Sequence, residues 1–207
     1  LLSKIPAALD FALHDCRFNW CFKTEPEPFM GDRTIDCPRG RALGGSSSIN
    51  GMQFVRGNPN DFDSWASNGL DNWDYAHCLP YFKRLENYER GGDDYRGHDG
   101  PLHVSPGSIH TPLDQAFLDG ASQAGHGTSE DSNGYRQDGF GLSDKNIYRG
   151  RRWSAFDAYL KPAVHRDNLQ VETGCLAYRI IFDDRRAIGV EYKASGQLTH
   201  AFAEKEV

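Results

Sequence analysis

The run PRGRALGGSSSINGMQFVRG, Pro38 to Gly57, is the part of this 207-residue chain that decides the fold. The glycine pair at 44–45 lets a backbone approach a ligand with no Cβ in the way, and the serines that follow offer hydroxyl and N–H groups. If Ser46 to Asn50 begins a helix, its free N–H groups favour an anion, and Arg39 and Arg41 raise the local positive potential. The run therefore predicts a loop that binds a phosphate or flavin group.

Three other interpretations of this run are weaker. A flexible linker has the same glycine and serine content, but the apolar residues of RAL and SINGMQFV on both sides must pack, which leaves the glycines little freedom. A serine-hydrolase elbow needs G-x-S-x-G, and the run after Gly44 lacks the second glycine. A P-loop needs G-K-[ST], which does not follow either.

Composition narrows the class of protein. A chain that is 38% hydrophobic and 12% aromatic can bury a core and should be globular. A net charge of −6 argues against nucleic acid as a partner, because phosphate contacts need a basic face. No apolar window is long enough for a transmembrane segment, and no signal-peptide pattern opens the chain. We expect a protein that is cytoplasmic or bound peripherally to the inner membrane.

The cysteines and histidines indicate neither a disulfide framework nor a metal site. The five cysteines are odd in number and form no C-x-x-C pair, which predicts reduced thiols. The histidines at 98, 103 and 110 have spacings that suit no metal-binding helix. The cysteines are Cys16, Cys21, Cys37, Cys78 and Cys175.

Hydrophobic periodicity and turn residues predict helices in the first three quarters of the chain and strands in the last. Asn72 is expected to cap a helix over residues 73–89, and Thr111 a helix that Gly125 stops. Other expected elements are a helix over Pro6–Leu13, an extended passage over Glu25–Phe29, a strand over Leu102–Val104 and a short helix from Ser154. A β-meander is expected over QVET, AYRIIF, AIGVEY and LTHAFAEKEV, with turns at 183–186 and 194–197. The order indicates an α/β (α+β) protein, and we expect the chain to be an excerpt of a longer one, since it lacks a starting Met and stops within a strand pattern.

The longest motif resembles a known family. Residues 40–63, GRALGGSSSINGMQFVRGNPNDFD, are similar to the first signature of the glucose-methanol-choline (GMC) flavin oxidoreductases, and TEPEP, YRGHDGPLHV and GRRWSAFDAYLKPA resemble the same family in the same order. The resemblance implies a partial FAD-binding Rossmann-like domain with a β-meander, plus part of a substrate-binding domain. Residues 1–70 and 154–207 would belong to the FAD-binding domain, and residues 71–153 to the substrate-binding domain.

The resemblance also implies which residues contact FAD. The glycine-serine run would pass along the pyrophosphate and the flavin ring, and a strand residue of the meander would touch the adenine through its backbone. Some family members attach the flavin covalently through a histidine where this chain has Ile49, so non-covalent FAD is expected. The residues that the resemblance assigns to FAD are Leu43, Gly44, Gly45, Ser46, Ser47, Asn50, Gly51, Met52 and Ala177.

The implied activity is oxidation of a primary alcohol by hydride transfer to the flavin, with electrons passed on to a respiratory chain or to oxygen. NWCFKTEPEP and NGYRQDGFG are most similar to the members that convert choline to betaine aldehyde. Oxidation of another aliphatic or aromatic alcohol, and a non-catalytic flavin-binding scaffold, remain alternatives. The family's C-terminal histidine that accepts the alcohol proton has no counterpart here, so no catalytic residue and no metal ligand is assigned. Aromatic residues such as Trp73, Tyr81 and Trp153 could cage a trimethylammonium group, but core packing is the simpler interpretation.

Overall fold

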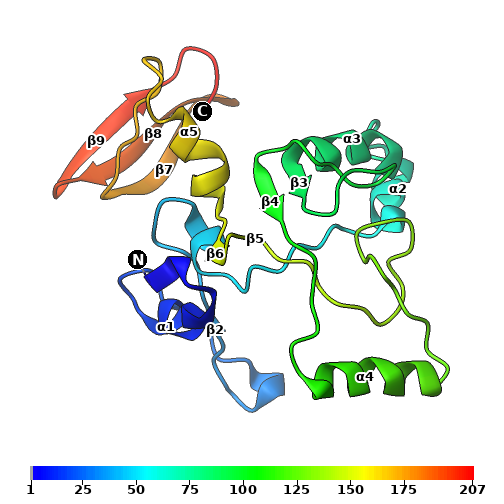
Figure 1. Ribbon diagram of the computed structural model, residues 1–207. Coiled ribbons are helices and arrows are strands. Elements are labelled where there is room, and N and C mark those ends of the chain that lie inside the picture. The colour runs from blue at the N-terminus through cyan, green and yellow to red at the C-terminus, as the bar shows by residue number, and fades with distance from the viewer. Residues whose placement is uncertain (1) are drawn as a thin grey trace. The chain divides into compact units, whose positions relative to one another are not determined.

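The computed structural model describes residues 2–207, which form two compact units divided after Pro162 (Figure 1). Unit 1 extends to Pro162 and holds helices and short two-stranded sheets, whereas unit 2, Ala163–Val207, is built around one three-stranded sheet. This mixture confirms the expected α/β (α+β) class. The division into domains at 1–70, 71–153 and 154–207 stays a prediction.

The N-terminal part of unit 1 begins with short helical turns. The turns η1 (Leu2–Lys4) and η2 (Pro6–Ala8) lead into α1 (Leu9–His14), which confirms the helix predicted from Pro6. The strands β1 (Phe22–Lys23) and β2 (Asp36–Cys37) pair antiparallel, and η3 (Pro28–Met30) lies between them. The predicted extended passage therefore ends at Glu27 instead of Phe29.

Two capped helices follow the glycine-serine run. The helix α2 (Pro59–Ser67) begins where the Asn58 side chain accepts from the Asn60 N–H, and α3 (Tyr75–Leu85) begins where Asp74 accepts from His77. The predicted Asn72 cap is therefore wrong, because Asn72 lies in a turn with φ +66° before the helix starts.

The predicted helix over residues 73–89 is also too long. Residues 86–88 leave the helix to form β3 (Glu86–Tyr88), which pairs in parallel with β4 (Leu102–Val104). The strand predicted at Leu102–Val104 is thus confirmed. Residues 86–88 pair with β4 across a 13-residue loop, and this pairing outweighs the helical periodicity of the local sequence. It is a tertiary effect that residues 73–89 alone do not encode.

The helix α4 (Pro112–Gln123) has the predicted start. Thr111 accepts from the Asp114 N–H, and the Asp114 carboxylate accepts in return from the Thr111 N–H at 2.9 Å, which makes a capping box. The chain then forms β5 (Ile147–Tyr148) and β6 (Arg151–Arg152), which pair antiparallel, and the π-helical turn η5 (Phe156–Leu160) with α5 (Lys161–Ala163). The last two elements confirm the short helix expected after Ser154.

The centre of unit 1 is an extended segment that follows the glycine-serine run. Met52, Phe54 and Arg56 are buried, whereas the alternate residues between them are exposed. The Phe54 N–H donates to the Asp144 carbonyl at 2.9 Å, which holds this segment against the chain before β5. Phe54 packs with Tyr88 and Val104, so the extended segment joins β3 and β4 in one apolar cluster.

A buried network of charges lies beside this cluster. The Glu86 carboxylate is fully buried and accepts from Arg96 Nε at 2.9 Å, while Arg56 Nη2 lies 2.9 Å from the same oxygen. Arg96 also contacts Asp144 at 2.9 Å and Asp131 at 2.6 Å. Burial by itself would lower the Arg96 pKa, but the hydrogen bonds and charges of Glu86 and Asp131 outweigh it and raise that pKa.

Unit 2 confirms most of the predicted meander. The strands β7 (Cys175–Asp183), β8 (Arg186–Ala194) and β9 (Gln197–Phe202) are antiparallel neighbours in that order. Both tight turns contain residues with positive φ, Asp184 in the first and Ser195 with Gly196 in the second, as short hairpin turns require. The strand predicted over residues 170–173 is wrong, since these residues pair with no strand in the described chain.

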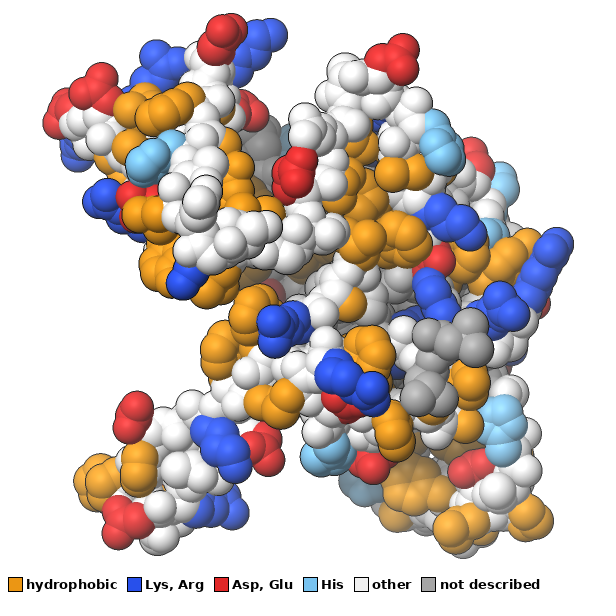
Figure 2. Space-filling model, turned by 90° about the vertical axis from the view of Figure 1, so that its left-hand side faces the viewer, with side chains coloured by type: hydrophobic (Ala, Val, Ile, Leu, Met, Phe, Trp, Pro, Cys, Tyr) orange, Lys and Arg blue, Asp and Glu red, His pale blue; other side chains and the backbone are white. Residues whose placement is uncertain are grey.

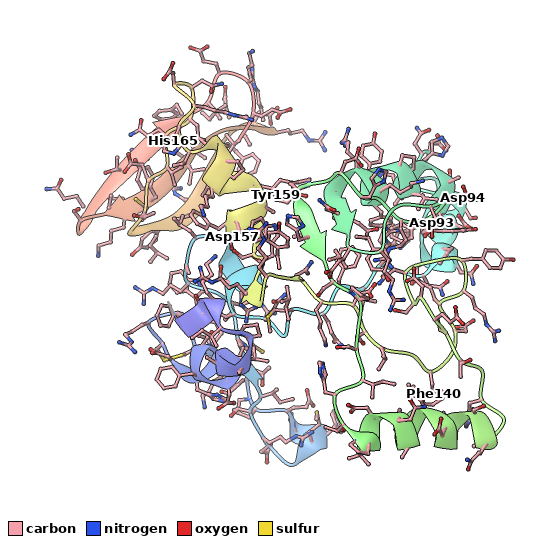
Figure 3. The ribbon with its side chains drawn as sticks, viewed as in Figure 1. Asp93, Asp94, Phe140, Asp157, Tyr159 and His165 are labelled. Atoms are coloured by element: carbon pink, nitrogen blue, oxygen red, sulfur yellow. A yellow bond between two sulfur atoms is a disulfide. The ribbon has the colours of Figure 1, made fainter. Side chains whose placement is uncertain are left out.

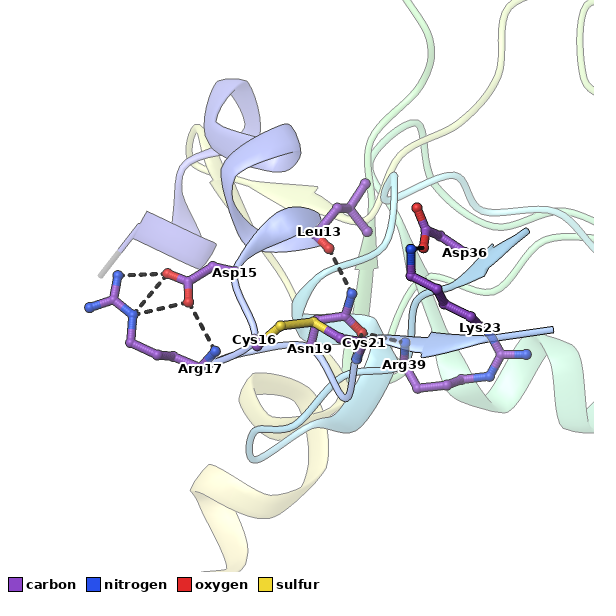
Figure 4. The surroundings of a disulfide bond; sticks show 9 residues. All are labelled: Leu13, Asp15, Cys16, Arg17, Asn19, Cys21, Lys23, Asp36 and Arg39. Carbon is purple, nitrogen blue, oxygen red and sulfur yellow. Dashed lines mark hydrogen bonds and ion pairs between the residues drawn. A yellow bond between two sulfur atoms is a disulfide. The ribbon is translucent and has the colours of Figure 1, made fainter. Parts of the chain in front are cut away.

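The structure corrects the expectation that all cysteines are reduced. Cys16 and Cys21 form a disulfide with their Cα atoms 5.7 Å apart, and Cys37, Cys78 and Cys175 are free (Figure 4). The cause is local: the Asn19 N–H donates to the Asp15 carbonyl, and this turn brings the two cysteines together at a spacing that matches no redox motif.

The part of the chain that the structure describes contains neither a membrane-spanning helix nor a cluster of metal ligands. Over residues 2–207, no helix combines the length and the apolar character needed to cross a bilayer. The same residues contain no group of three or more His, Cys, Asp or Glu side chains that could hold a metal ion.

Candidate cofactor site

The start of the glycine-serine run is hydrogen-bonded to the segment that contains the disulfide (Figure 4). The buried Asn19 side chain donates to the Leu13 carbonyl at 2.6 Å and accepts from the Arg39 N–H at 2.9 Å. On either side of this contact, Trp20 N–H donates to the Arg39 carbonyl and Arg41 N–H to the Phe18 carbonyl. The start of the loop is therefore fixed to the chain before it, which excludes a slack linker.

The glycines of the loop have two different functions. A Cβ on Gly40 would lie 2.1 Å from the Gly45 carbonyl oxygen, and one on Gly44 would lie 3.1 Å from the Phe156 backbone, so these two positions are needed for the chain's own packing. A Cβ on Gly45 or Gly51 would meet no atom within 4 Å. Gly45 also has φ +56°, which L side chains rarely adopt. The bare backbone at 45 and 51 thus faces open space.

The three serine hydroxyls mostly hold the loop together. Ser47 donates to the Gly44 carbonyl and accepts from the Ala155 N–H at 2.9 Å, and Ser48 donates to the Leu43 carbonyl at 2.8 Å. Ser46 accepts from the Gly40 N–H at 3.0 Å. Among contacts within the described residues, only the Ser46 hydroxyl therefore keeps its proton free for another acceptor, which is less than the sequence suggested.

The helix considered from Ser46 to Asn50 is not formed. The turn η4 (Gly45–Ser48) is a four-residue 3₁₀ turn, and Ile49 ends it with its side chain 1% exposed. A turn this short has little macrodipole, so the positive potential of the loop must come from side chains.

The next three residues form a strained turn. The Asn50 side-chain oxygen accepts from the Met52 N–H at 3.1 Å, and Met52 has φ +61°, a conformation that costs a non-glycine residue about 1 kcal/mol or more. The Met52 carbonyl accepts from the Asn146 N–H at 2.7 Å, which anchors the turn to the segment before β5. Met52 is buried, and its N–H and its carbonyl are both hydrogen-bonded within the chain, so it shapes the turn more than it offers groups to a ligand. The Gly51 N–H donates to no group in the part of the chain that the structure describes.

Arg152 supports this turn from inside the protein. Its side chain is 1% exposed, and Nη1 donates to the Asn50 carbonyl at 2.6 Å, to the Asn50 side-chain oxygen at 2.9 Å and to the Ser47 carbonyl at 3.2 Å. Nε donates to the Ser3 carbonyl at 2.8 Å. Burial lowers the Arg152 pKa, and among the described residues no carboxylate pairs with it.

Asp157, the first acidic residue after Arg152 in the sequence, is already paired with another cation. Asp157, on η5 (Figure 3), accepts from the Ser154 hydroxyl at 2.6 Å and forms an ion pair with Lys4. Burial would raise the Asp157 pKa, but the hydrogen bonds from Lys4 and Ser154 outweigh it and lower that pKa. The Lys4–Asp157 pair is neutral overall, so Arg152 leaves one positive charge behind the loop.

These features fit the predicted flavin cofactor. Two glycines leave the backbone open to close approach, one N–H is available at Gly51, and a buried cation lies behind the turn. Such a site suits an anionic or electron-rich group that approaches the backbone closely, and it needs no nucleophilic side chain to bind one.

The structure brings most of the predicted residues together. Those from Leu43 to Met52 lie on one continuous loop of unit 1, with the Leu43 side chain exposed. Ala177 lies in unit 2, on β7, beside a β-bulge between it and Arg179. No sequence pattern singles out Arg152, because one arginine of an Arg-Arg pair reveals its burial only when β6 sets the direction of its side chain.

Unit 1 also contains an apolar cavity of about 600 Å³. Phe62, Trp73, Tyr81 and Phe82 contribute aromatic side chains to its lining, together with the Arg56 cation. Of the aromatic residues considered for a trimethylammonium cage, Trp73 and Tyr81 line this cavity, whereas Trp153 packs edge-on against His103. The cage stays a prediction.

Curated relatives match almost the whole chain. It is 48% identical over 98% of its length to the mitochondrial choline dehydrogenase of Mus musculus, covering 34% of that protein. It is 49% identical over 99% of its length to the oxygen-dependent choline dehydrogenase of Rhizobium johnstonii, covering 37% of it. The chain therefore spans about a third of the length of these relatives.

Solved structures share the fold. The pyridoxine 4-oxidase of Mesorbium loti has a TM-score of 0.90 at 30% identity, and the match spans 98% of this chain and 40% of the oxidase chain. An FAD-dependent oxidoreductase of Chaetomium thermophilum, with a TM-score of 0.83 at 24% identity, covers 91% of this chain and 35% of its own, and it supports the fold alone. The family model of GMC oxidoreductases matches residues 22–207, and the chain belongs to this family.

Proposed function

We propose that the protein to which this chain belongs is an FAD-dependent dehydrogenase that oxidises choline to betaine aldehyde. The observation that carries this proposal is the identity of 48–49% to choline dehydrogenases over nearly the whole chain. The open glycines and the buried cation of the loop support it from the side of chemistry. Residues 1–70 and 154–207 would contribute to the FAD-binding domain, and residues 71–153 to the substrate-binding domain.

The loop would hold the cofactor through its backbone. FAD, when bound, supplies the acceptor for the hydride that leaves the alcohol carbon. Gly45 and Gly51 leave room for close approach, and the Gly51 N–H offers a donor. Leu43, Gly44, Ser46, Ser47, Asn50 and Met52 complete the predicted contact surface. Among them, Gly44 and Ser47 act mainly by fixing the loop, as their contacts with Phe156 and Ala155 indicate.

We propose that the FAD is held without a covalent bond. Ile49 occupies the place where some family members have a flavin-linked histidine, and its hydrocarbon side chain has no nucleophilic atom. Its burial at 1% exposure supports a packing function. Precipitation of the complete protein with acid should release all flavin into the supernatant, whereas a yellow pellet would contradict this proposal.

Ala177 would contact the adenine through its backbone. It lies on β7, an outer strand of the three-stranded sheet, next to a β-bulge, and both features leave main-chain groups free of ladder partners. A backbone contact is independent of side-chain size, so Ala177→Val should keep FAD affinity within about twofold.

A second candidate substrate is an alcohol carried on an aromatic ring. It is favoured by the TM-score of 0.90 and the identity of 30% to a pyridoxine oxidase. No residue of this chain is assigned as the base that accepts the alcohol proton, and both oxygen and a respiratory chain remain acceptors to test.

The decisive experiment uses the complete gene product. Its absorption spectrum should show bound flavin, and it should reduce a dye acceptor with choline faster than with simple primary alcohols or pyridoxine. Oxygen consumption in place of dye reduction identifies the acceptor. A purified protein without flavin would contradict the cofactor proposal. Turnover of pyridoxine in place of choline would change only the substrate, and bound flavin with no turnover of any alcohol would favour a non-catalytic scaffold.

A further inference from the structure

Arg152 is unusual because it is buried and hydrogen-bonded but meets no anion among the residues that the structure describes. All of its acceptors are neutral: the carbonyls of Ser3, Ser47 and Asn50 and the Asn50 side-chain oxygen. Its Nη2 is buried and has no partner among the described residues. A buried charge without a counter-ion is costly, so such a group needs a compensating function or an anion supplied from outside the chain.

The place of Arg152 in the fold suggests that function. The side chain reaches the turn formed by Asn50, Gly51 and Met52, and its contact with the Asn50 carbonyl is the shortest of its four hydrogen bonds, at 2.6 Å. The Asn50 carbonyl and the free Gly51 N–H belong to the same planar peptide group. A hydrogen bond that fixes this carbonyl therefore also fixes the direction of the Gly51 N–H. The same contact places the positive charge directly behind the open backbone of the turn.

We propose that Arg152 is a positioning residue for the cofactor: it orients the Gly51 N–H toward the ring and supplies the positive charge that favours the ring's electron-rich, reduced state. This inference rests on the proposed FAD function. An acceptor that took up a hydride would gain one negative charge, so a fixed cation nearby would stabilise its reduced form relative to its oxidised form. Arg152 then has two separable effects, one through geometry and one through charge.

Substitution of Arg152 in the complete protein separates these effects. Arg152→Met removes the charge and the hydrogen bonds, so the midpoint potential of bound FAD should become more negative and FAD should dissociate roughly tenfold or more readily. Arg152→Lys keeps the charge but not the fork of donors, so it should largely restore the potential while restoring FAD affinity only in part.

The neighbouring arginine provides a matched control. Arg151 lies on the same strand, β6, but its side chain is exposed. Arg151→Met removes one positive charge from the surface, where solvent screens it, and should leave the potential and the FAD affinity unchanged.

A third variant keeps the proposal testable if Arg152 variants fail to fold. Asn50→Asp preserves the shape of the side chain and places a carboxylate where the Asn50 oxygen now lies, 2.9 Å from Arg152 Nη1. The new ion pair should hold the turn in place but cancel the charge, so the potential should become more negative without loss of thermal stability. An unchanged potential in this variant would show that charge at the turn does not influence the flavin, and it would contradict the electrostatic part of the proposal.

The outcomes separate the two proposals. If the unmodified protein binds no flavin, the proposed function fails and this inference fails with it. If the unmodified protein binds FAD but both Asn50→Asp and the folded Arg152 variants match Arg151→Met in potential and affinity, only the inference about Arg152 is overturned.

Discussion

Gly40 and Gly44 are needed because the chain packs against them, whereas Gly45 and Gly51 leave the backbone open. Met52 adds a third kind of constraint, since its positive φ is maintained by hydrogen bonds from both sides of the turn. Strain of this kind persists only where the surroundings over-determine it, and it is common where a ligand binds. Single residues of the loop can therefore be assigned to packing or to the open surface.

The open surface at Gly45 can be tested with a paired substitution. Gly45→Ala should weaken FAD binding by roughly tenfold or more, because the added Cβ occupies the space that the cofactor needs. Gly31→Ala is the control: Gly31 also has a positive φ, +70°, and also meets no atom within 4 Å, but lies outside the loop. Each change should cost about 1 kcal/mol of stability through backbone strain. Equal FAD titrations for the two variants would contradict the assignment.

At the scale of elements, unit 1 is held together by a charged centre as well as an apolar one. Glu86, at the start of β3, contacts Arg56 of the extended segment and Arg96 of the loop that precedes β4. Removing one member of such a buried network leaves the others uncompensated, which is more destabilising than losing a surface pair.

Glu86→Gln should therefore lower the free energy of unfolding by about 3–5 kcal/mol. The control Asp36→Asn removes the exposed pair with Lys23, whose atoms are 3.3 Å apart, and should cost about 0–1 kcal/mol. Urea denaturation of the purified complete protein measures both. A loss below 1 kcal/mol for Glu86→Gln would show that the network contributes little.

The capping box of α4 should make that helix sensitive to acid. Backbone N–H groups of His110 and Thr111 donate to the Asp114 carboxylate and lower its pKa in the folded state. The stabilisation is thus complete above the unfolded-state pKa and is lost as the pH falls through the lower, folded-state value.

Hydrogen exchange can measure this dependence. Protection of the first turn of α4, corrected for the intrinsic rate, should stay level above about pH 5 and fall once the pH drops below about 4, the ordinary pKa of an Asp carboxyl. Asp114→Asn should reduce the protection at every pH and abolish this dependence. Protection that stays level in the unmodified protein, or an Asn variant with the same acid transition, would argue against the capping box as the cause.

On the scale of the whole molecule, many large apolar side chains reach the surface (Figure 2). The sheet of unit 2 contributes several of them, including Tyr178, Phe182 and Phe202, which are 56%, 58% and 71% exposed. Large apolar side chains exposed together on one sheet are typical of a surface that contacts another polypeptide segment or a ligand. It accords with a chain that spans about a third of its curated relatives.

We expect residues 1–207, produced alone, to bind a hydrophobic fluorescent dye strongly and to self-associate. The complete gene product at the same molar concentration is the control and should bind much less dye. Size-exclusion chromatography and dye fluorescence measure the two effects. A monomeric, dye-silent polypeptide with one sharp unfolding transition would contradict this expectation.

The sequence by itself determined the features that depend on local chemistry. The α4 cap follows from Thr-Pro-x-Asp, the hairpins of unit 2 from alternation and turn residues, and the family from the run at 40–63. Local patterns gave wrong predictions where contacts between distant segments competed with them. Residues 86–88, for example, pair with β4 instead of continuing the predicted helix. The disulfide was missed because the turn that joins Cys16 to Cys21 leaves no motif.

Only the tertiary structure decided which residues of the loop serve packing and which leave groups open to a ligand. It assigned two glycines to packing, turned most serine hydroxyls inward and revealed Arg152 beneath the turn. These outcomes depend on groups about 100 residues apart in the chain, such as Asn50 and Arg152. Composition and spacing specify which groups are available, but burial, which sets the energy of a charge and the direction of a side chain, exists only after the chain has folded.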